Sequence, residues 1–287
     1  MKPREEKPKK ERVHCSLCPN SCVLAEGQVG ACRARRARNG EVVSDSYGKV
    51  TSLALDPIEK KPFARFMSGS RILSIGSFGC NLHCAFCQNA SISQAGIDDV
   101  PWQEISPEKL INEALRLKPQ GNVGIAYTYN EPLINFEYVF DCSYLAHEAG
   151  LMNVLVSNGT INAEMLERLL PYLDAVNIDL KGFSQDFYSF VGGSLETVMH
   201  SIELFAQCST CHIEVTTLIV PGMNDSEEEI DALSSWLASL NPEIPYHVSR
   251  FFPCYKMKEI APTPIQSVYH LAEVARKHLR YVYTGNC

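Results

Sequence analysis

The chain has 287 residues, and 45% of them are hydrophobic, which is enough for a full-sized core in one large α/β domain with a small appendage. A formal net charge of -7 and an isoelectric point near 5.7 create no overall field that would attract a polyanion, so we expect no nucleic-acid partner. No run of roughly eighteen apolar residues is present, so we also expect no membrane span.

Residues 1–11 (MKPREEKPKKE) are almost wholly charged or proline, and we expect a disordered, solvated tail rather than a signal peptide. The protein is therefore expected to be cytoplasmic. Thiols stay reduced in that compartment, so the 12 cysteines do not predict a disulfide framework. Seven of these cysteines fall in two tight clusters, and ligation of a metal or cluster explains that grouping better than packing does.

Residues 12–45 form a separate cysteine-rich module, and residues 46–70 form a β-rich connection to the main domain. The module has the spacing C-x2-C-x3-C-x9-C, made by Cys15, Cys18, Cys22 and Cys32. Four thiolates in a segment without a large core of its own indicate a bound metal that holds the fold together. We favour zinc, which suits a closed tetrahedral sulfur site; a second iron-sulfur cluster and free thiols are the alternatives, and His14 could replace one ligand.

A basic run follows the last of these cysteines and contains Arg33, Arg35, Arg36 and Arg38. It could dock an acidic reductant such as flavodoxin or ferredoxin. We favour the simpler interpretation, which is a solvated charged face.

From residue 71 to residue 287, short β-branched runs alternate with longer amphipathic stretches. The predicted strands are 71–78, 121–129, 153–159, 175–181, 212–220, 245–253 and 280–286. The predicted helices are 107–118, 163–173, 194–207, 226–240 and 265–279. Strands separated by helices indicate an α/β domain with right-handed parallel crossovers. Periodicity alone does not separate an open doubly wound sheet from a complete or partial barrel.

Polar motifs follow the predicted strands in order. The loop with Cys80, Cys84 and Cys87 follows the first strand, and the later strands end at or precede NEP (130–132), SNG (157–159), DLKG (179–182) and PGMND (221–225). In either architecture the functional loops follow the carboxyl ends of the strands, so we expect these residues on one rim.

Cys80, Cys84 and Cys87 lie within eight residues and can ligate three corners of an iron-sulfur cubane or three positions of a zinc tetrahedron. Zinc would need a fourth ligand, for which His83 would have to fold back against its own neighbour. An iron-sulfur cluster with one open iron is the simpler interpretation, and buried or zinc-bound cysteines are the alternative.

This C-x3-C-x2-C spacing, with Phe86 just before the last cysteine, resembles the signature of the radical S-adenosylmethionine (radical SAM) superfamily. The resemblance implies a partial (β/α)6 TIM-type barrel of parallel strands carrying a small N-terminal metal-binding extension. It also implies a 4Fe-4S cluster and SAM, whose amino and carboxylate groups chelate the fourth iron in that superfamily. The absence of a fourth thiol from the loop then leaves the catalytic position free.

The same resemblance assigns further cofactor-binding residues. Those nearest the SAM amino group would be Asn130 and Glu131, where the superfamily often has Gly and Glu. Polar contacts to the ribose and carboxylate would come from Ser157 and Asn158, and Asp179 and Lys181 resemble a DLK motif in which the Asp holds a cation near the SAM carboxylate. Phe86 would lie near the adenine. Taken singly, these residues could be helix caps or turns.

The implied reaction is reductive cleavage of SAM to methionine and a 5′-deoxyadenosyl radical, which abstracts hydrogen from an unidentified protein or small-molecule substrate in an anaerobic setting. The cofactors carry out this chemistry, and the protein excludes water and positions the target hydrogen. No catalytic acid or base can be named from the sequence. The implied class is a radical SAM oxidoreductase or activase-like enzyme, reduced by flavodoxin or a ferredoxin-type protein.

Within the superfamily, CAFCQN, SNG, DLK and LIVPGMND resemble the pyruvate formate-lyase activating enzymes, so glycyl-radical activation is an alternative function. Thr216 and Tyr255 stand where those relatives have Arg and His. A longer resemblance, carried by HCSLCPNSC, GACRARRARNG, DPIEKKP, AYTYNEP, SRFFPCYKM and YVYTGN, is to the radical SAM member of the AmmeMemoRadiSam system. It implies an AMMECR1-type or Memo-type partner. A remoter alternative is a non-catalytic, metal-stapled binding protein.

Overall fold

The structure, a computed structural model, describes residues 12–287, so the predicted tail at residues 1–11 lies outside the described residues. Its centre is an eight-stranded sheet in the order β14-β13-β12-β11-β10-β9-β7-β6. The strands are β6 (Ser52–Pro57), β7 (Arg71–Gly76), β9 (Asn122–Tyr127), β10 (Met152–Ser157), β11 (Ala175–Asp179), β12 (His212–Ile219), β13 (Tyr246–Arg250) and β14 (Val282–Gly285). Each of the seven predicted strands is present.

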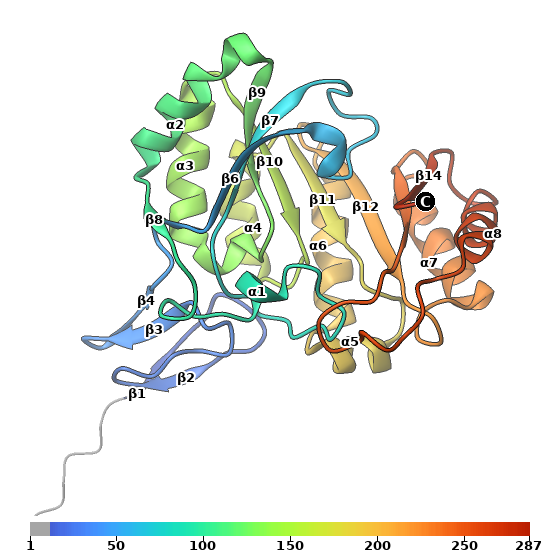
Figure 1. The fold of residues 1–287 in the computed structure, drawn as a ribbon, viewed down its shortest axis with the longest axis horizontal. Coiled ribbons are helices and arrows are strands. Elements are labelled where there is room, and N and C mark those ends of the chain that lie inside the picture. Colours follow the sequence, from blue (N-terminus) through green and yellow to red (C-terminus); the bar gives the residue numbers. More distant parts are fainter. Residues whose placement is uncertain (1–11) are drawn as a thin grey trace, which may run out of the picture.

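All neighbours from β7 to β14 pair in parallel, and their order in the sheet follows their order in the chain. Right-handed crossovers between consecutive neighbours carry every helix to the same side of the sheet, which is the arrangement of a barrel. A doubly wound sheet would instead reverse its strand order part-way. The sheet curves but its edge strands, β14 and β6, are not paired with each other in the described residues, so the barrel is partial, as predicted (Figure 1).

The helices are α1 (Ala90–Ser93), α2 (Pro107–Arg116), α3 (Phe136–Glu148), α4 (Ala163–Leu169), α5 (Gln185–Val191), α6 (Leu195–Gln207), α7 (Glu227–Leu240) and α8 (Ile265–Ala275), with short 3-10 turns at Ile58–Lys60, Lys118–Gln120, Pro132–Asn135 and Leu170–Tyr172. Four of them begin at a serine whose side chain accepts a hydrogen bond from the first turn: Ser106, Ser184, Ser194 and Ser226. These caps fix where each helix leaves the rim and therefore where each loop ends.

Strand β6 joins the sheet antiparallel to β7 and so extends the barrel from within the predicted connection. The residues after it, 58–66, which we call the floor segment, pack against the sheet. Ile58 and Phe63 form a small apolar cluster with residues of the neighbouring strands, namely Ile72, Ala126, Val154 and Ala175. The floor segment therefore covers the sheet at the end away from the cysteine loop.

Residues 12–44 form two antiparallel hairpins, β1 (Arg12–His14) with β2 (Val23–Ala25) and β3 (Arg35–Arg38) with β4 (Glu41–Ser44). A third small pair joins β5 (Lys49–Val50) to β8 (Gln103–Glu104). Figure 1 shows the hairpins beside α1, at the end of the barrel where the cysteine loop lies. The division of the chain at residues 45 and 70 stays a prediction.

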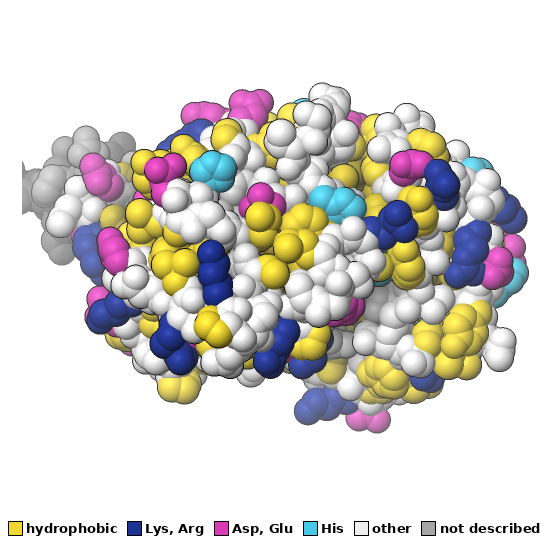
Figure 2. All heavy atoms as spheres, turned by 90° about the horizontal axis from the view of Figure 1, so that it is seen from above, with side chains coloured by type: hydrophobic (Ala, Val, Ile, Leu, Met, Phe, Trp, Pro, Cys, Tyr) yellow, Lys and Arg dark blue, Asp and Glu magenta, His cyan; other side chains and the backbone are white. Residues whose placement is uncertain are grey.

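Charges of both signs are interspersed on the face in Figure 2, which is the end of the molecule away from the hairpins. No single-sign field covers this face, in keeping with the modest net charge of -7. Across residues 12–287, no helix has both the length and the apolar character needed to cross a bilayer.

Candidate active site

A cavity of about 650 Å³ opens at the carboxyl ends of the parallel strands. Its volume lies within the range of small-molecule and cofactor sites. Predicted site residues that line it are Cys80, Cys84, Cys87, Phe86, Asn130, Glu131, Asn158, Asp179 and Lys181. Ser157 is buried just behind the wall and does not line it. The rim therefore brings together side chains from four segments that are up to about a hundred residues apart.

The cysteine loop is braced by Asn130. Its Oδ1 accepts a hydrogen bond from the Ser77 backbone N–H at 2.9 Å, and its Nδ2 donates to the carbonyls of Phe78 and Gly79 at 3.2 and 3.0 Å. This amide is thus committed to the strand-to-loop turn, which a glycine at position 130 could not hold. Asn130 supports the loop from beneath rather than presenting its side chain freely to a ligand.

Gly79 makes the turn into the loop possible. Its φ of +84° is in the left-handed region, and a Cβ there would lie 2.4 Å from the carbonyl oxygen of Cys32. The next residue, Cys80, donates its backbone N–H to that same carbonyl at 3.1 Å. The cysteine loop is therefore seated directly on the N-terminal module.

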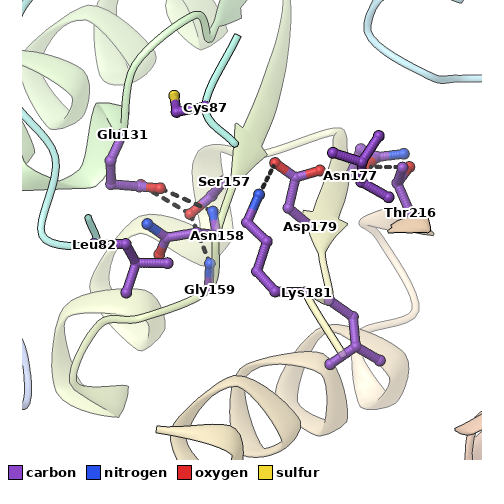
Figure 3. Close-up of polar contacts among 12 residues, drawn as sticks. Leu82, Cys87, Glu131, Ser157, Asn158, Gly159, Asn177, Asp179, Lys181 and Thr216 are labelled. Atoms are coloured by element: carbon purple, nitrogen blue, oxygen red, sulfur yellow. Dashed lines mark hydrogen bonds and ion pairs between the residues drawn. The ribbon is translucent and has the colours of Figure 1, made fainter. Parts of the chain in front are cut away.

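Glu131 organises the neighbouring strand end (Figure 3). Its carboxylate accepts hydrogen bonds from the Ser157 hydroxyl and the Asn158 backbone N–H, both at 2.8 Å, and from the Leu133 N–H at 3.0 Å. Burial raises the pKa of Glu131 to about 7, although these donors oppose the rise. The Asn158 side chain then reaches the loop, since its Nδ2 lies 3.6 Å from the Cys80 sulfur and 3.0 Å from Asn81 Oδ1.

Asp179 and Lys181 form an ion pair on the cavity wall, with Lys181 Nζ 2.9 Å from Asp179 Oδ2 (Figure 3). Burial by itself would lower the pKa of Lys181, but Asp179 and the nearby Cys84 raise it, so the side chain stays an ammonium. Burial raises the pKa of Cys84 to about 11, partly offset by Lys181. A cationic group thus lies beside the thiols that would carry negative charge as thiolates.

Phe86 is buried and stacks on Phe187 with ring centroids 5.9 Å apart. The FFPCYK loop after β13 closes over this part of the cysteine loop. Cys254 donates its thiol to the Phe86 carbonyl at 3.1 Å, and the Lys256 N–H donates to the Ala85 carbonyl at 3.0 Å.

The far wall contains polar residues that sequence reasoning did not assign to the site. Asn81 belongs to the cysteine loop, does not line the cavity, and donates to the Thr160 carbonyl at 2.6 Å, which holds the loop in place. The cavity below this loop is lined by Thr216, His247 and Ser249. The last three point inward because side chains alternate along a strand. That alternation in β12 and β13 is the signal that could have identified them.

His83 does not line the cavity and is exposed, with its ring against Gly192. Cys208 and Cys211 lie between α6 and β12, and they border a different, open hollow at the other end of the barrel. They are therefore separate from the cysteine loop.

The donor set fits an iron-sulfur cluster and SAM. Three thiols from one short loop face a cavity, and that cavity continues past an ammonium, a carboxylate and amides that can bind a polar, zwitterionic ligand.

A model of the radical SAM superfamily matches residues 74–234, and the chain belongs to this superfamily. Members are enzymes that use a 4Fe-4S cluster and SAM. The uncharacterized protein MJ0808 of Methanocaldococcus jannaschii is 40% identical over 284 residues, which are 98% of this chain and 83% of that one.

Two further proteins place this likeness in context. The pyruvate formate-lyase-activating enzyme of Clostridium pasteurianum is 26% identical over 178 residues, covering 59% of this chain and 72% of the relative. The crystal structure of QueE from Escherichia coli matches with a TM-score of 0.53 at 15% identity, covering 83% of this chain and 93% of that one. The last likeness supports the fold.

Replacing Asn130 with alanine is expected to weaken iron retention about 10- to 100-fold, the range found for residues that orient metal ligands from behind. The turn at residues 77–79 would lose three hydrogen bonds that hold the thiols in place. Iron release to a chelator under anaerobic conditions measures this effect. Asn112→Ala, an exposed asparagine on α2, is the matched control, and equal release rates in the two variants would contradict the bracing role.

Proposed function

We propose that this protein reductively cleaves SAM and uses the resulting radical on a protein or small-molecule substrate. The cluster and SAM, when bound and reduced, supply a 5′-deoxyadenosyl radical that abstracts a hydrogen atom. The observation that supports this most is the single cavity shared by three thiols of one loop and by Glu131, Asn158, Asp179 and Lys181. A structural metal site has no need of such a cavity.

Each side chain has a proposed task. The thiols of Cys80, Cys84 and Cys87 hold three irons. The ammonium of Lys181 faces the SAM carboxylate and is kept charged by Asp179, while Phe86 offers an apolar surface to the adenine. Glu131 accepts three hydrogen bonds, two of which orient Ser157 and Asn158, and its remaining lone pair, on Oε2, is left for the SAM ammonium.

The lower part of the cavity is proposed to take the substrate. Thr216, His247 and Ser249 line it from the strands, and Lys60 of the floor segment and Tyr129 reach it from the opposite side. These groups can donate and accept hydrogen bonds around a polar substrate group. The barrel wall would meanwhile exclude water from the radical.

The decisive experiment is anaerobic reconstitution with iron and sulfide followed by addition of dithionite and SAM. We expect stoichiometric or catalytic formation of 5′-deoxyadenosine and methionine. A fully loaded, brown sample that forms neither product would overturn the enzyme assignment and favour the metal-stapled binding protein.

Glycyl-radical activation is the second candidate, and its support is the 26% identity to a pyruvate formate-lyase-activating enzyme. Thr216 differs from that pattern and here donates to Asn177 Oδ1 at 2.9 Å, so no cation projects from this position. An electron paramagnetic resonance doublet on a partner glycine would favour the activase. Its absence beside active SAM cleavage would favour another substrate.

The partners are proposed from the chemistry and the resemblance. A low-potential flavodoxin or ferredoxin-type protein supplies the electron, and an AMMECR1-type or Memo-type protein of the AmmeMemoRadiSam system is the candidate partner or substrate. Anaerobic pull-down with the loaded protein tests each. Capture of neither by a sample that cleaves SAM would argue for a small-molecule substrate.

A further inference from the structure

The four N-terminal cysteines surround one small enclosed space. Its lining includes Cys15, Cys18, Cys22 and Cys32 together with Arg35 and Ile134. The space is about 10 Å³, which is about the room that one water molecule needs. Three of the four thiol residues are buried, so the space belongs to the interior of the module.

The size of this space bears on which metal centre it suits. The centre of a water-sized sphere in this space is separated from each sulfur by at least the van der Waals contact distance. That distance is longer than the Zn–S bond of about 2.3 Å. Thiols already arranged around a single ion would leave no such space. Residues 12–287 also contain no group of three His, Cys, Asp or Glu side chains gathered around a single-ion position. A cubane has metal and sulfide atoms between its thiolates, and thiols spaced more widely fit it.

Arg35 lines this space and carries an unpartnered donor. Its side chain is only 7% exposed, and its terminal nitrogens bond to Glu137 at 2.7 Å and to the Ile134 carbonyl at 3.2 Å. The remaining donor, Nε, is buried without a hydrogen-bond partner. A buried donor without a partner destabilises the fold unless a bound group accepts a hydrogen bond from it. Sulfide or thiolate sulfur of an anionic cluster would accept that hydrogen bond. The Ala31 N–H, which already donates to Cys22 Sγ at 3.5 Å, offers a second such bond.

The N-terminal module also contacts the active-site loop through one of its own predicted ligands. The Cys32 carbonyl accepts a hydrogen bond from the Cys80 N–H at 3.1 Å. The path from the Cys32 thiol to the Cys80 thiol therefore consists of covalent bonds and this one hydrogen bond. Asn20 adds a second link, from its Nδ2 to the Asn81 carbonyl at 3.1 Å. The two cysteine sets thus form one continuous structure.

We infer that Cys15, Cys18, Cys22 and Cys32 hold a second 4Fe-4S cluster, fully ligated by protein, which passes single electrons to the active-site cluster. A flavodoxin or ferredoxin-type protein is oxidised by one electron as the N-terminal cluster is reduced, and that cluster is reoxidised as the active-site cluster gains the electron. No proton or leaving group is involved. The electron-transfer part rests on the proposed function, whereas the identity of the metal centre does not. This inference replaces the zinc ion that the spacing had favoured.

Metal analysis of the variant Cys80→Ala/Cys84→Ala/Cys87→Ala tests the centre separately from SAM cleavage. After anaerobic reconstitution in the presence of both iron and zinc, we expect about 4 iron and 4 sulfide per chain. One zinc without iron, or no metal, would overturn the proposal. If this variant fails to fold, wild type is compared with Cys18→Ser/Cys22→Ser, and a fall from about 8 to about 4 iron is expected.

Spectroscopy distinguishes the two centres in the intact protein. A saturated cluster has no open iron, so we expect one reduced-cluster paramagnetic resonance signal that SAM leaves unchanged beside one that SAM alters. Arg35→Lys removes the Nε–H and should shift the potential of the SAM-insensitive cluster to more negative values. Glu137→Gln, which keeps Nε, should shift it less. A single signal wholly altered by SAM would contradict the second cluster.

The electron relay has its own measurement, the ratio of 5′-deoxyadenosine formed with reduced flavodoxin to that formed with dithionite. We expect this ratio to fall at least about tenfold in Cys18→Ser/Cys22→Ser. Flavodoxin would lose its route through the N-terminal cluster, whereas dithionite is small enough to reduce the active-site cluster directly. An unchanged ratio would overturn the relay. Two clusters without any 5′-deoxyadenosine would instead overturn the proposed function.

Discussion

Cys80→Ala is expected to lower SAM-dependent formation of 5′-deoxyadenosine by about a thousandfold or more, because the reaction depends on a cofactor that this residue would no longer hold. The thiol lies at the start of the loop and receives a hydrogen bond from the Leu82 N–H at 3.4 Å and a contact from Asn158 Nδ2 at 3.6 Å. Its loss leaves two thiols for three irons. Iron content after reconstitution should fall in the same variant.

Cys208→Ala is the matched control, since this cysteine lies at the other end of the barrel and its side chain bonds only locally, to Thr210 at 3.3 Å. It should retain both iron and product formation. Circular dichroism of the two variants separates loss of ligation from loss of fold. If Cys80→Ala keeps more than about a tenth of wild-type activity, Cys80 is not a cluster ligand.

Local patterns predicted the barrel well because strand and helix periodicities are properties of short segments. Each of the seven strands was expected from runs of β-branched residues, and the motifs from NEP to PGMND do follow successive strands. Once the strands are parallel, their carboxyl ends must meet at one rim. The rim could therefore be assembled from sequence without any knowledge of contacts.

Contacts between distant segments could not be predicted from the sequence. Asn130, which the resemblance puts near the SAM amino group, lines the cavity, but the sequence does not reveal that its amide is bonded to the loop at residues 77–79. The Cys32 carbonyl meets the Cys80 N–H across 48 residues, and no periodicity encodes such a pair. Ser157 resembles a residue that contacts SAM, but in the structure the Ser157 hydroxyl donates a hydrogen bond to Glu131 and lies behind the cavity wall. Side-chain direction at a turn depends on partners that fold in from elsewhere.

The floor segment is the clearest case of such a partner. Its residues Ala64 and Arg65 donate their backbone N–H groups to Glu214 of β12, at 2.8 to 3.2 Å. Glu214 is completely buried and also binds two histidines, His212 at 2.9 Å and His247 at 2.5 Å. His247 lines the cavity, so this carboxylate links the floor segment to the wall of the proposed substrate space.

Glu214→Gln is expected to lower the free energy of unfolding by about 2 to 4 kcal/mol at pH 7. The glutamine NH2 group, which cannot accept hydrogen bonds, would face backbone and histidine donors that bind both carboxylate oxygens in the wild type. Burial alone would raise the pKa of Glu214, but hydrogen bonds from both histidines and both backbone N–H groups lower it to about 2. This stabilisation, about 3 kcal/mol, is complete above the pKa of an unfolded glutamate near 4.5 and is lost as the pH falls towards 2.

Urea unfolding of the reconstituted protein under argon, from pH 7 to pH 3, measures the effect. The wild type should lose stability steeply below about pH 5, and the difference from Glu214→Gln should shrink over the same interval. Glu243→Gln is the control, because its pair with Arg280 at 2.6 Å is on the surface and contributes less than about 1 kcal/mol. A constant difference at every pH would mean that Glu214 acts through packing, and the carboxylate would then have no part in holding the floor segment under the cavity.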